Sequence, residues 1–361
     1  MPTIMTRGAA TAKGFGFGAT KGGFKGFNTP ALVNGYTGSS AYISSVTVNS
    51  AGLFVLVGYT ANSYPLYATS TDGNTWSSPA KMNGSTTPAN MFAVTVNSSG
   101  LFVATGSTDT GYPVYATSSN GSTWTTPALM NGSSTIAFMV AVAVNSSGKF
   151  VSVGYDINGY PIYATSTNGS TWTTPATMNG STVPAYISSV TVNSSGLFVA
   201  VGYDGNNYPV YATSSNGSTW TTPATMNGST TPANMFAVTV NSSCLFVAVG
   251  SDGTNQYPIY ATSTNGSTWT TPATMNGSTV PANISGVTVS SSGLFVAVGP
   301  SNGGAPLYAT SSNGSTWTTP AKMNGSTVAV TITSVTVNSA GLFVAVGEEN
   351  TGPYAIYATS K

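Results

Sequence analysis

The sequence predicts an all-β protein that folds as a seven-bladed β-propeller with four strands in each blade. Two observations point to this fold. The first is a long internal repeat that contains several short apolar segments. The second is that the last repeat is incomplete, and a segment near the N-terminus matches the strand that it lacks. Repeats of about 40–50 residues built from short strands are typical of propeller blades rather than of helical solenoids.

A tryptophan marks the repeat. It recurs every 48 residues, with one step of 49, at Trp76, Trp124, Trp172, Trp220, Trp269 and Trp317. Phe27 holds the same place in a seventh copy, because Gly-Phe-Asn-Thr-Pro-Ala-Leu-Val-Asn-Gly (26–35) matches Thr-Trp-Thr-Thr-Pro-Ala-Leu-Met-Asn-Gly (123–132). Seven copies predict seven blades.

Each repeat contains four predicted strands, as the copy around Trp220 shows. Residues 190–192 are β-branched, and residues 197–201 form the unbroken apolar run that is typical of a strand buried on both faces. A third strand is predicted at 209–213. The turn signal Asn216-Gly217 then leads into a fourth strand at 220–223.

A proline supports this strand order. Proline cannot donate a hydrogen bond to a sheet, so it favours an edge strand. Every copy has one in the predicted fourth strand: Pro30, Pro79, Pro127, Pro175, Pro223, Pro272 and Pro320. The fourth strand is therefore expected at the outer rim of the ring.

The two ends of the chain are predicted to complete one blade. The last repeat stops at residues 356–361, after its third strand, and the missing fourth strand lies at about 24–31. Pairing of these segments closes the ring. The chain then divides into a Gly-rich N-terminal tail, residues 1–23, and a propeller, residues 24–361.

Composition excludes several classes of function. Only 4% of the residues are charged and the net charge is +1, so no surface for nucleic acid is expected. No apolar run approaches the roughly 20 residues of a spanning helix, so membrane insertion is not expected. Histidine, the commonest general base and the commonest zinc ligand, is absent. Arg7 is the single arginine. We predict no catalytic residues, no metal site, no cofactor and no enzymatic activity.

The turn before each tryptophan, for example Thr165-Ser166-Thr167-Asn168-Gly169-Ser170-Thr171-Trp172, resembles the Asp-box of sialidase-like (BNR) propellers, Ser-x-Asp-x-Gly-x-Thr-Trp. Gly, Thr and Trp match at six turns. The Asp position holds Thr71, Ser119, Thr167, Ser215, Thr264 and Ser312, whose hydroxyls are expected to cap the turn instead. The resemblance implies the fold. It does not carry over sialidase activity, because the arginine cluster of those enzymes cannot be assembled here.

The N-terminal stretch Arg7-Gly8-Ala9-Ala10-Thr11-Ala12-Lys13-Gly14-Phe15-Gly16-Phe17 looks like the leader of structural proteins of marine tailed bacteriophages. That resemblance implies attachment to other virion proteins. Glycine alternating with phenylalanine offers aromatic anchors on a flexible chain, so Arg7, Lys13, Phe15 and Phe17 are the candidate anchoring residues. The alternative is a disordered tail.

Ligand binding is predicted on the face that carries the loops between second and third strands, because these loops and the connections between blades vary most. The candidates on this face are Tyr64, Tyr112, Tyr160, Tyr208, Tyr257, Asp156, Asp204, Asp252 and Tyr186. Tyrosine and neutral polar groups suit a sugar. Structural roles are the alternatives: the aspartates can stabilise turns, and Phe92, Phe138 and Phe236 can fill the central channel as part of the hydrophobic core. Calcium binding at residues 204–207 is a further alternative.

These features lead to one functional hypothesis and two alternatives. The first is a non-enzymatic virion protein of a marine bacteriophage (a tail fibre, spike or surface decoration), present in multiple copies on the extracellular particle and displaying its propeller toward host glycans. The second is a secreted or surface-bound bacterial lectin. The third is a self-assembling module without a ligand.

Overall fold

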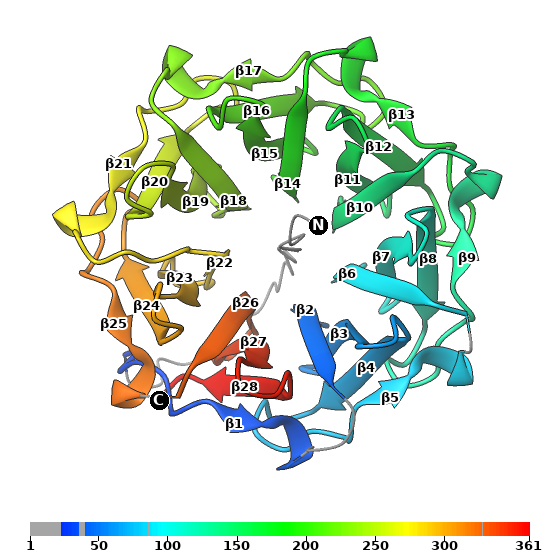
Figure 1. Ribbon diagram of the computed structural model, residues 1–361, viewed down its shortest axis with the longest axis horizontal. Coiled ribbons are helices and arrows are strands. Elements are labelled where there is room, and N and C mark those ends of the chain that lie inside the picture. Colours follow the sequence, from blue (N-terminus) through cyan, green and yellow to red (C-terminus); the bar gives the residue numbers. More distant parts are fainter. Residues whose placement is uncertain (1–22, 36–39, 86, 327) are drawn as a thin grey trace.

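The computed structural model describes residues 23–35, 40–85, 87–326 and 328–361. These residues form seven four-stranded antiparallel sheets arranged in a ring (Figure 1), which confirms the seven-bladed β-propeller. Among them, no helix is long and apolar enough to cross a membrane. The predicted tail, with Arg7, Lys13, Phe15 and Phe17, lies outside the described residues.

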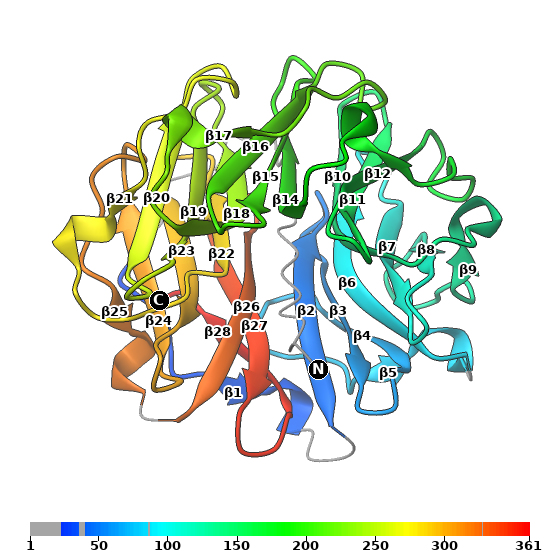
Figure 2. The ribbon, with the colours of Figure 1, turned by 45° about the horizontal axis from the view of Figure 1, so that its top comes forward.

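The strands of each blade follow one another outward from the centre of the ring, and Figure 2 shows the inner strands along its axis. The inner strands are β2 (Ala41–Val48), β6 (Ala89–Val96), β10 (Ala137–Val144), β14 (Ala185–Val192), β18 (Ala233–Val240), β22 (Gly286–Val289) and β26 (Val330–Val337). The second strands are β3 (Phe54–Thr60), β7 (Phe102–Thr108), β11 (Phe150–Asp156), β15 (Phe198–Asp204), β19 (Phe246–Asp252), β23 (Phe295–Pro300) and β27 (Phe343–Glu349).

The outer half of each blade has one long strand and one very short strand. The third strands are β4 (Pro65–Ser70), β8 (Pro113–Ser118), β12 (Pro161–Ser166), β16 (Pro209–Ser214), β20 (Pro258–Ser263), β24 (Pro306–Ser311) and β28 (Ala355–Thr359). The rim strands are β5 (Ala80–Lys81), β9 (Ala128–Leu129), β13 (Ala176–Thr177), β17 (Ala224–Thr225), β21 (Ala273–Thr274), β25 (Ala321–Lys322) and β1 (Ala31–Leu32). A single 3-10 turn follows each rim strand: η1 (Val33–Gly35), η2 (Met82–Gly84), η3 (Met130–Gly132), η4 (Met178–Gly180), η5 (Met226–Gly228), η6 (Met275–Gly277) and η7 (Met323–Gly325).

The chain ends close the ring as predicted. Strand β1 pairs with β28, with Ala31 opposite Tyr357 and Leu32 opposite Ile356, and Phe27 forms a further bridge to Ser360. The backbone N–H of Asn28 also donates to the carbonyl of Thr359 at 2.8 Å. One blade therefore combines three C-terminal strands with one N-terminal strand.

Two strand predictions were wrong in their bounds. The inner strand β14 begins at Ala185 rather than at 190, because it continues through a β-bulge between Ile187 and Ser189. The rim strand β17 begins after Pro223 rather than before it. Proline has no N–H to donate, so regular pairing starts only at the next residue.

The turn between third and rim strands is capped by a different residue from the one predicted. The side-chain Oδ1 of Asn168 accepts hydrogen bonds from the backbone N–H groups of Ser170 and Thr171, at 2.9 and 2.8 Å. The Oγ of Ser166 accepts from Gly169 N–H at 2.8 Å. Thr167, at the Asp position of the resemblance, lies between these two capping residues.

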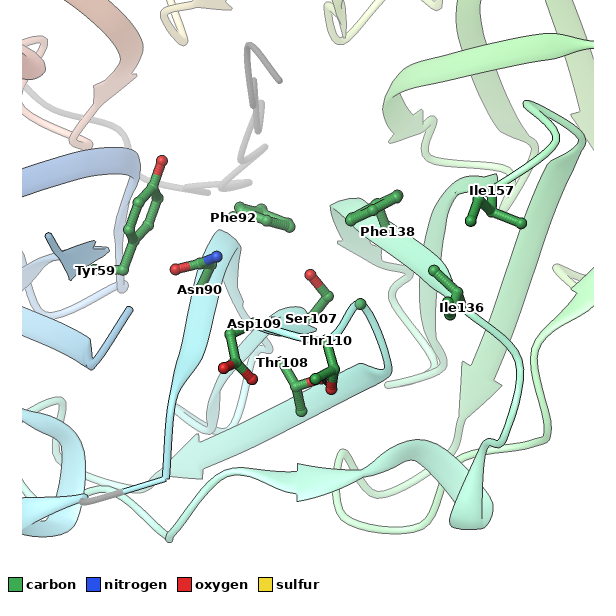
Figure 3. A pocket seen from close by; sticks show the side chains of 11 residues that line it. Tyr59, Asn90, Phe92, Ser107, Thr108, Asp109, Thr110, Ile136, Phe138 and Ile157 are labelled. Carbon is green, nitrogen blue, oxygen red and sulfur yellow. Dashed lines mark hydrogen bonds between the residues drawn. The ribbon is translucent and has the colours of Figure 1, made fainter. Parts of the chain in front are cut away.

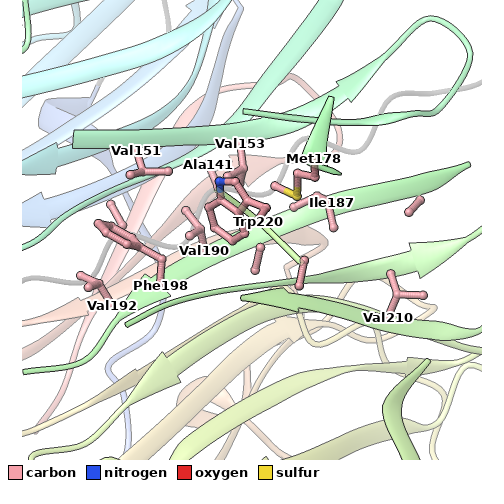
Figure 4. Close-up of a cluster of buried hydrophobic side chains, with 14 residues drawn as sticks. Ala141, Val151, Val153, Met178, Ile187, Val190, Val192, Phe198, Val210 and Trp220 are labelled. Atoms are coloured by element: carbon pink, nitrogen blue, oxygen red, sulfur yellow. The ribbon is translucent and has the colours of Figure 1, made fainter. Parts of the chain in front are cut away.

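The hydrophobic core lies between blades. One cluster joins Ala141, Val151 and Val153 of one blade to Val190 and Trp220 of the next (Figure 4). At its edge Tyr163 packs on Trp220, with ring centroids 6.2 Å apart, and its hydroxyl donates to the carbonyl of Ser218 at 2.5 Å. The same contact between a tyrosine of one blade and the tryptophan of the next recurs for Tyr67, Tyr115, Tyr211 and Tyr260. Each blade thus buries its apolar faces only when its neighbours are present.

Candidate functional site

A pocket of about 350 Å³ opens on the face that carries the loops between second and third strands, called here the loop face. It spans three consecutive blades, those of β2–β5, β6–β9 and β10–β13 (Figure 3). It is lined by Tyr59, Asn90, Phe92, Ser107, Thr108, Asp109, Thr110, Gly111, Ile136, Phe138 and Ile157.

Two polar side chains of the pocket have atoms without partners. Asn90 on β6 and Ser107 on β7 are directly opposite each other in the sheet, and Ser107 is only 1% exposed. In the described part of the chain, neither Asn90 Oδ1 nor Ser107 Oγ has a hydrogen-bond partner, and both atoms are buried. Because buried polar atoms are nearly always hydrogen-bonded in folded proteins, these two atoms mark a place where a polar ligand or water belongs.

Aromatic rings form the walls around these polar atoms. Phe92 lies at the bulge of β6, between Met91 and Ala93, and meets Tyr59 of the preceding blade edge to face with centroids 6.2 Å apart. Phe138, from the following blade, also lines the pocket (Figure 3). A β-bulge redirects the side chain it carries, and Phe92 lines the pocket although its side chain is only 3% exposed. Phe92 is therefore buried, as the core alternative expects, and it also lines the pocket together with Phe138.

The loop of residues 108–111 forms the rim of the pocket. The Oγ1 of Thr108 accepts a hydrogen bond from Tyr112 N–H at 2.9 Å and so caps the turn. Gly111 adopts a φ of +89°, and a Cβ there would lie 2.7 Å from the side chain of Ile136, so glycine is required. Asp109 stands one residue beyond the capping position and is exposed. Its carboxylate is the single charged group that lines the pocket.

The aspartates predicted as ligand residues cap their own loops. Asp156 Oδ1 accepts from Asn158 N–H and Tyr160 N–H at 2.9 and 2.8 Å. Asp204 and Asp252 each cap the corresponding loop in the same way, through two backbone N–H groups. The turn interpretation accounts for these bonds. Among the described residues no group of three or more Asp, Glu, Cys or His side chains could hold a metal ion.

The predicted tyrosines occupy two kinds of position on the loop face. Five of them immediately precede the third strands, two strands outward from the inner strands, and are half-buried: Tyr64, Tyr112, Tyr160, Tyr208 and Tyr257. Tyr64 lies under the ammonium of Lys81, which is 3.7 Å from the ring centroid. Tyr186, by contrast, lies at the start of inner strand β14, where it stacks on Tyr203 at 5.3 Å and contacts Tyr155 at 5.2 Å. None of these six predicted tyrosines lines the pocket.

The pocket exists because one blade differs from its neighbours at two positions. In six of the seven blades the second residue of the inner strand faces a residue near the end of the second strand, and we call these two residues the face pair. The face pairs fixed by strand register are Tyr42 with Tyr59, Asn90 with Ser107, Phe138 with Tyr155, Tyr186 with Tyr203, Asn234 with Ser251, and Thr331 with Glu348. Three pairs are aromatic. Asn90 and Ser107 are small, and they leave space where a ring stands in both adjacent blades.

Burial changes the acidity of two other residues in face pairs. It raises the pKa of Glu348 to about 8, although a hydrogen bond from the backbone of Ile43 partly offsets this. Burial, together with the neighbouring Tyr203 and Tyr186, raises the pKa of Tyr155 to about 12. Burial therefore favours the uncharged form of both Tyr155 and Glu348.

Comparisons with solved structures identify the architecture. The BP39L lectin from Burkholderia pseudomallei superposes with a TM-score of 0.68 at 15% identity, over 87% of this chain and 94% of the lectin. The chain shares the fold of a known lectin. YCF48 from Cyanidioschyzon merolae gives a TM-score of 0.60 at 15% identity, covering 92% of this chain and 98% of that protein.

A sialidase also has this architecture. The Hadza microbial sialidase Hz136 matches with a TM-score of 0.53 at 14% identity, covering 92% of this chain and 68% of the enzyme. No protein-family model matches the sequence, and no curated protein matches it. These similarities establish the propeller fold of sialidase-like and lectin proteins, and at such low identity they establish nothing finer. The resemblance of residues 7–17 to a phage leader stays a prediction.

Proposed function

We propose that the protein is a carbohydrate-binding propeller whose principal site is the pocket of Asn90, Phe92, Ser107 and Phe138. The observation that carries the proposal is the pair of buried, unpartnered oxygens beneath aromatic walls. A pyranose offers hydroxyls that can donate to Asn90 Oδ1 and pair with Ser107 Oγ. Its C–H groups can pack on the rings of Phe92 and Phe138.

Size and charge define the class of sugar. A volume of about 350 Å³ lies at the small end of ligand pockets, which suits one or two sugar units. Among the residues that the structure describes, no lysine or arginine lines the pocket, and the rim carries the carboxylate of Asp109. An anionic sugar would therefore meet repulsion without a compensating cation. The expected ligand is a neutral or amino sugar, bound without chemical conversion.

The supporting scaffold is suited to display such a site. The lectin from Burkholderia pseudomallei has the same architecture, so the fold can carry sugar recognition. In this chain the site lies on the loop face, away from the short turns that join the first and second strands. We further propose, from the resemblance of residues 7–17 alone, that the N-terminal tail attaches the propeller to a phage particle as a tail fibre, spike or surface decoration.

Filling the pocket tests the sugar site. Ser107→Tyr introduces the residue that occupies this place as Tyr59 and Tyr155 in the adjacent blades, so the fold should accept it. A glycan array on residues 24–361 first identifies a neutral or amino sugar, and titration calorimetry then measures its affinity. We expect Ser107→Tyr to weaken binding at this pocket at least about tenfold, because the substitution removes Ser107 Oγ and the new ring blocks Asn90 Oδ1.

A matched control places the same ring elsewhere. Ser242 is exposed in the turn between the first and second strands of another blade, and Ser242→Tyr should leave the affinity unchanged. Equal binding by wild type and Ser107→Tyr would exclude the pocket as the site. If the wild type binds no neutral, amino or acidic glycan on the array, the self-assembling module without a ligand becomes the better description.

The attachment proposal has a separate test. Deletion of residues 1–23 should prevent incorporation into particles while the propeller keeps its sugar affinity. If the deleted protein is incorporated normally, the tail does not anchor it. If no particle contains the full-length protein, a secreted or surface-bound lectin becomes the better description.

A further inference from the structure

We infer that the loop face carries a second, unlike sugar site, formed by Asn234, Phe236 and Ser251 with Tyr203 of the preceding blade. This inference rests on the proposed function, because it assigns the same ligand chemistry to another blade. The blade β18–β21 lies across the ring from β6–β9 (Figure 1). The two sites would therefore flank the centre of one face.

The polar floor of the first pocket recurs in this blade. Asn234 on β18 faces Ser251 on β19, as Asn90 faces Ser107. Ser251 is 2% exposed. In the described residues Asn234 Oδ1 is buried without a hydrogen-bond partner, as Asn90 Oδ1 is. The same buried acceptor is thus unpaired in two blades, in each case beside an aromatic ring of the loop face.

The aromatic wall recurs with nearly the same geometry. Strand β18 bulges between Met235 and Ala237, so Phe236 takes the place of Phe92. Phe236 meets Tyr203 edge to face at 6.4 Å and 82°, while Phe92 meets Tyr59 at 6.2 Å and 87°. The ring and the unpartnered oxygen therefore keep the same relation to the strand in both blades.

The opposite wall differs in chemistry. By repeat alignment Asn283 and Pro281 stand where the first pocket has Phe138 and Ile136, and Asn302 stands where it has Ile157. The backbone there is fixed by hydrogen bonds from Asn283 N–H to the carbonyl of Pro300 at 2.9 Å and from Asn302 N–H to that of Pro281 at 3.2 Å. One wall of the second site is therefore polar, and its amides can contact additional hydroxyls.

The acidic group also differs between the sites. Asp252 Oδ1 caps its own loop through Thr254 N–H and Asn255 N–H, at 3.2 and 2.6 Å, whereas Asp109 takes no part in capping its loop. The second site thus has fewer apolar contacts and a carboxylate tied to the backbone. We expect it to bind a monovalent sugar about tenfold more weakly than the first.

Two unlike sites on one face select for extended ligands. A polysaccharide that reaches both sites gains from effective concentration, provided its length spans the distance between them. A single sugar gains nothing from the second site. The inferred ligand is therefore a repeating neutral or amino polysaccharide rather than an isolated terminal sugar.

The experiment counts sites with a monovalent ligand. The methyl glycoside of the sugar found on the array is titrated into wild type, Ser107→Tyr, Ser251→Tyr and the double variant, with calorimetry and native mass spectrometry as readouts. We expect two sites in wild type, the weaker one lost in Ser251→Tyr, the tighter one lost in Ser107→Tyr, and neither left in the double variant. Polysaccharide affinity should fall at least tenfold in Ser251→Tyr although the tight site is intact.

One result overturns this inference without touching the proposed function: a single site in wild type that Ser107→Tyr abolishes and Ser251→Tyr leaves unchanged. Absence of binding to wild type contradicts both. If Ser251→Tyr does not fold, Asn234→Tyr is the substitute, because Tyr42 and Tyr186 occupy that position in other blades. Circular dichroism and the melting temperature establish folding for each variant.

Discussion

Blades β2–β5 and β6–β9 are neighbours with the same backbone and different chemistry. Both have an eight-residue inner strand with a bulge at the same place, and both end in a two-residue rim strand and a 3-10 turn. In the first blade the face pair is Tyr42 and Tyr59, stacked at 5.2 Å. In the second it is Asn90 and Ser107, with two unpartnered oxygens.

The comparison separates two kinds of position. Scaffold positions, such as the tryptophan before each rim strand, hold the same residue in six repeats and contact the adjacent blade. Face pairs vary because their side chains lie at the end of the sheet, where a ring and a small polar group are both compatible with the backbone. The protein can therefore change its binding surface blade by blade while the interfaces between blades stay constant.

The largest expected effect comes from breaking a scaffold position. Trp220 is 3% exposed, packs on Tyr163 of the adjacent blade, and donates from Nε1 to the carbonyl of Gly217 at 3.2 Å. Trp220→Ala should lower the free energy of unfolding by about 3–5 kcal/mol, because it opens a cavity between blades. Urea unfolding measures this loss. Ser107→Tyr, in a face pair, should change the free energy of unfolding by less than about 1 kcal/mol. A similar loss of stability in both variants would contradict the distinction between scaffold positions and face pairs.

The same division explains what the sequence could predict. The repeat of Trp220 and its counterparts, with Phe27 as the seventh, was enough for the blade number and for the closure of the ring, because those residues recur for packing reasons. The pocket depends instead on a departure from the repeat at Asn90 and Ser107. Comparing face pairs between blades could have found it, but only once strand register was known, since a bulge displaces Phe92 from simple alternation.

The sequence predicted which loops are turns stabilised by polar side chains, but not which side-chain atoms accept the hydrogen bonds. Asp156, Asp204 and Asp252 were candidates for both turn and ligand roles, and sequence alone cannot tell which atoms a carboxylate will meet. The structure shows backbone N–H groups on all three. Asp109 differs because Thr108 already caps its loop, and this one-residue offset leaves the Asp109 carboxylate at the rim of the pocket without a capping role.

Glu348 extends the comparison to an acidic face pair. Its pKa is raised to about 8 from an ordinary value of 4.5, mainly by burial, so the folded state favours the protonated form. The stabilisation is fully present below pH 4.5 and is lost as the pH rises through 8. We expect unfolding to become easier by roughly 2–3 kcal/mol between pH 5 and pH 9.

Glu348→Gln isolates that effect, since glutamine keeps the shape without titrating. Melting temperatures of wild type and Glu348→Gln should agree at pH 5 and diverge at pH 9, where the variant should be the more stable. If the melting temperatures of the two proteins change in parallel between pH 5 and pH 9, the burial of Glu348 does not affect stability in this range. Sugar binding at the pocket of Asn90 and Ser107 should follow neither curve, because Glu348 belongs to another blade.

The smallest expected effect lies on the opposite face, where one blade departs from the repeat and gains only weak contacts. Cys244 occupies a turn position held by glycine in the other repeats, at Gly196 for example, and it adopts a left-handed φ of 63°. A side chain in this region costs about 1 kcal/mol relative to glycine. Its sulfur gains only two weak contacts, each at 3.8 Å, with Asn193 and Ser194. Cys244→Gly should therefore raise the free energy of unfolding by about 0.5–1 kcal/mol and leave sugar affinity unchanged, whereas Gly196→Cys should lower stability by a similar amount. If Cys244→Gly instead weakens the protein, the sulfur contacts contribute more than the backbone strain costs, and this turn would be a position where a departure from the repeat is stabilising.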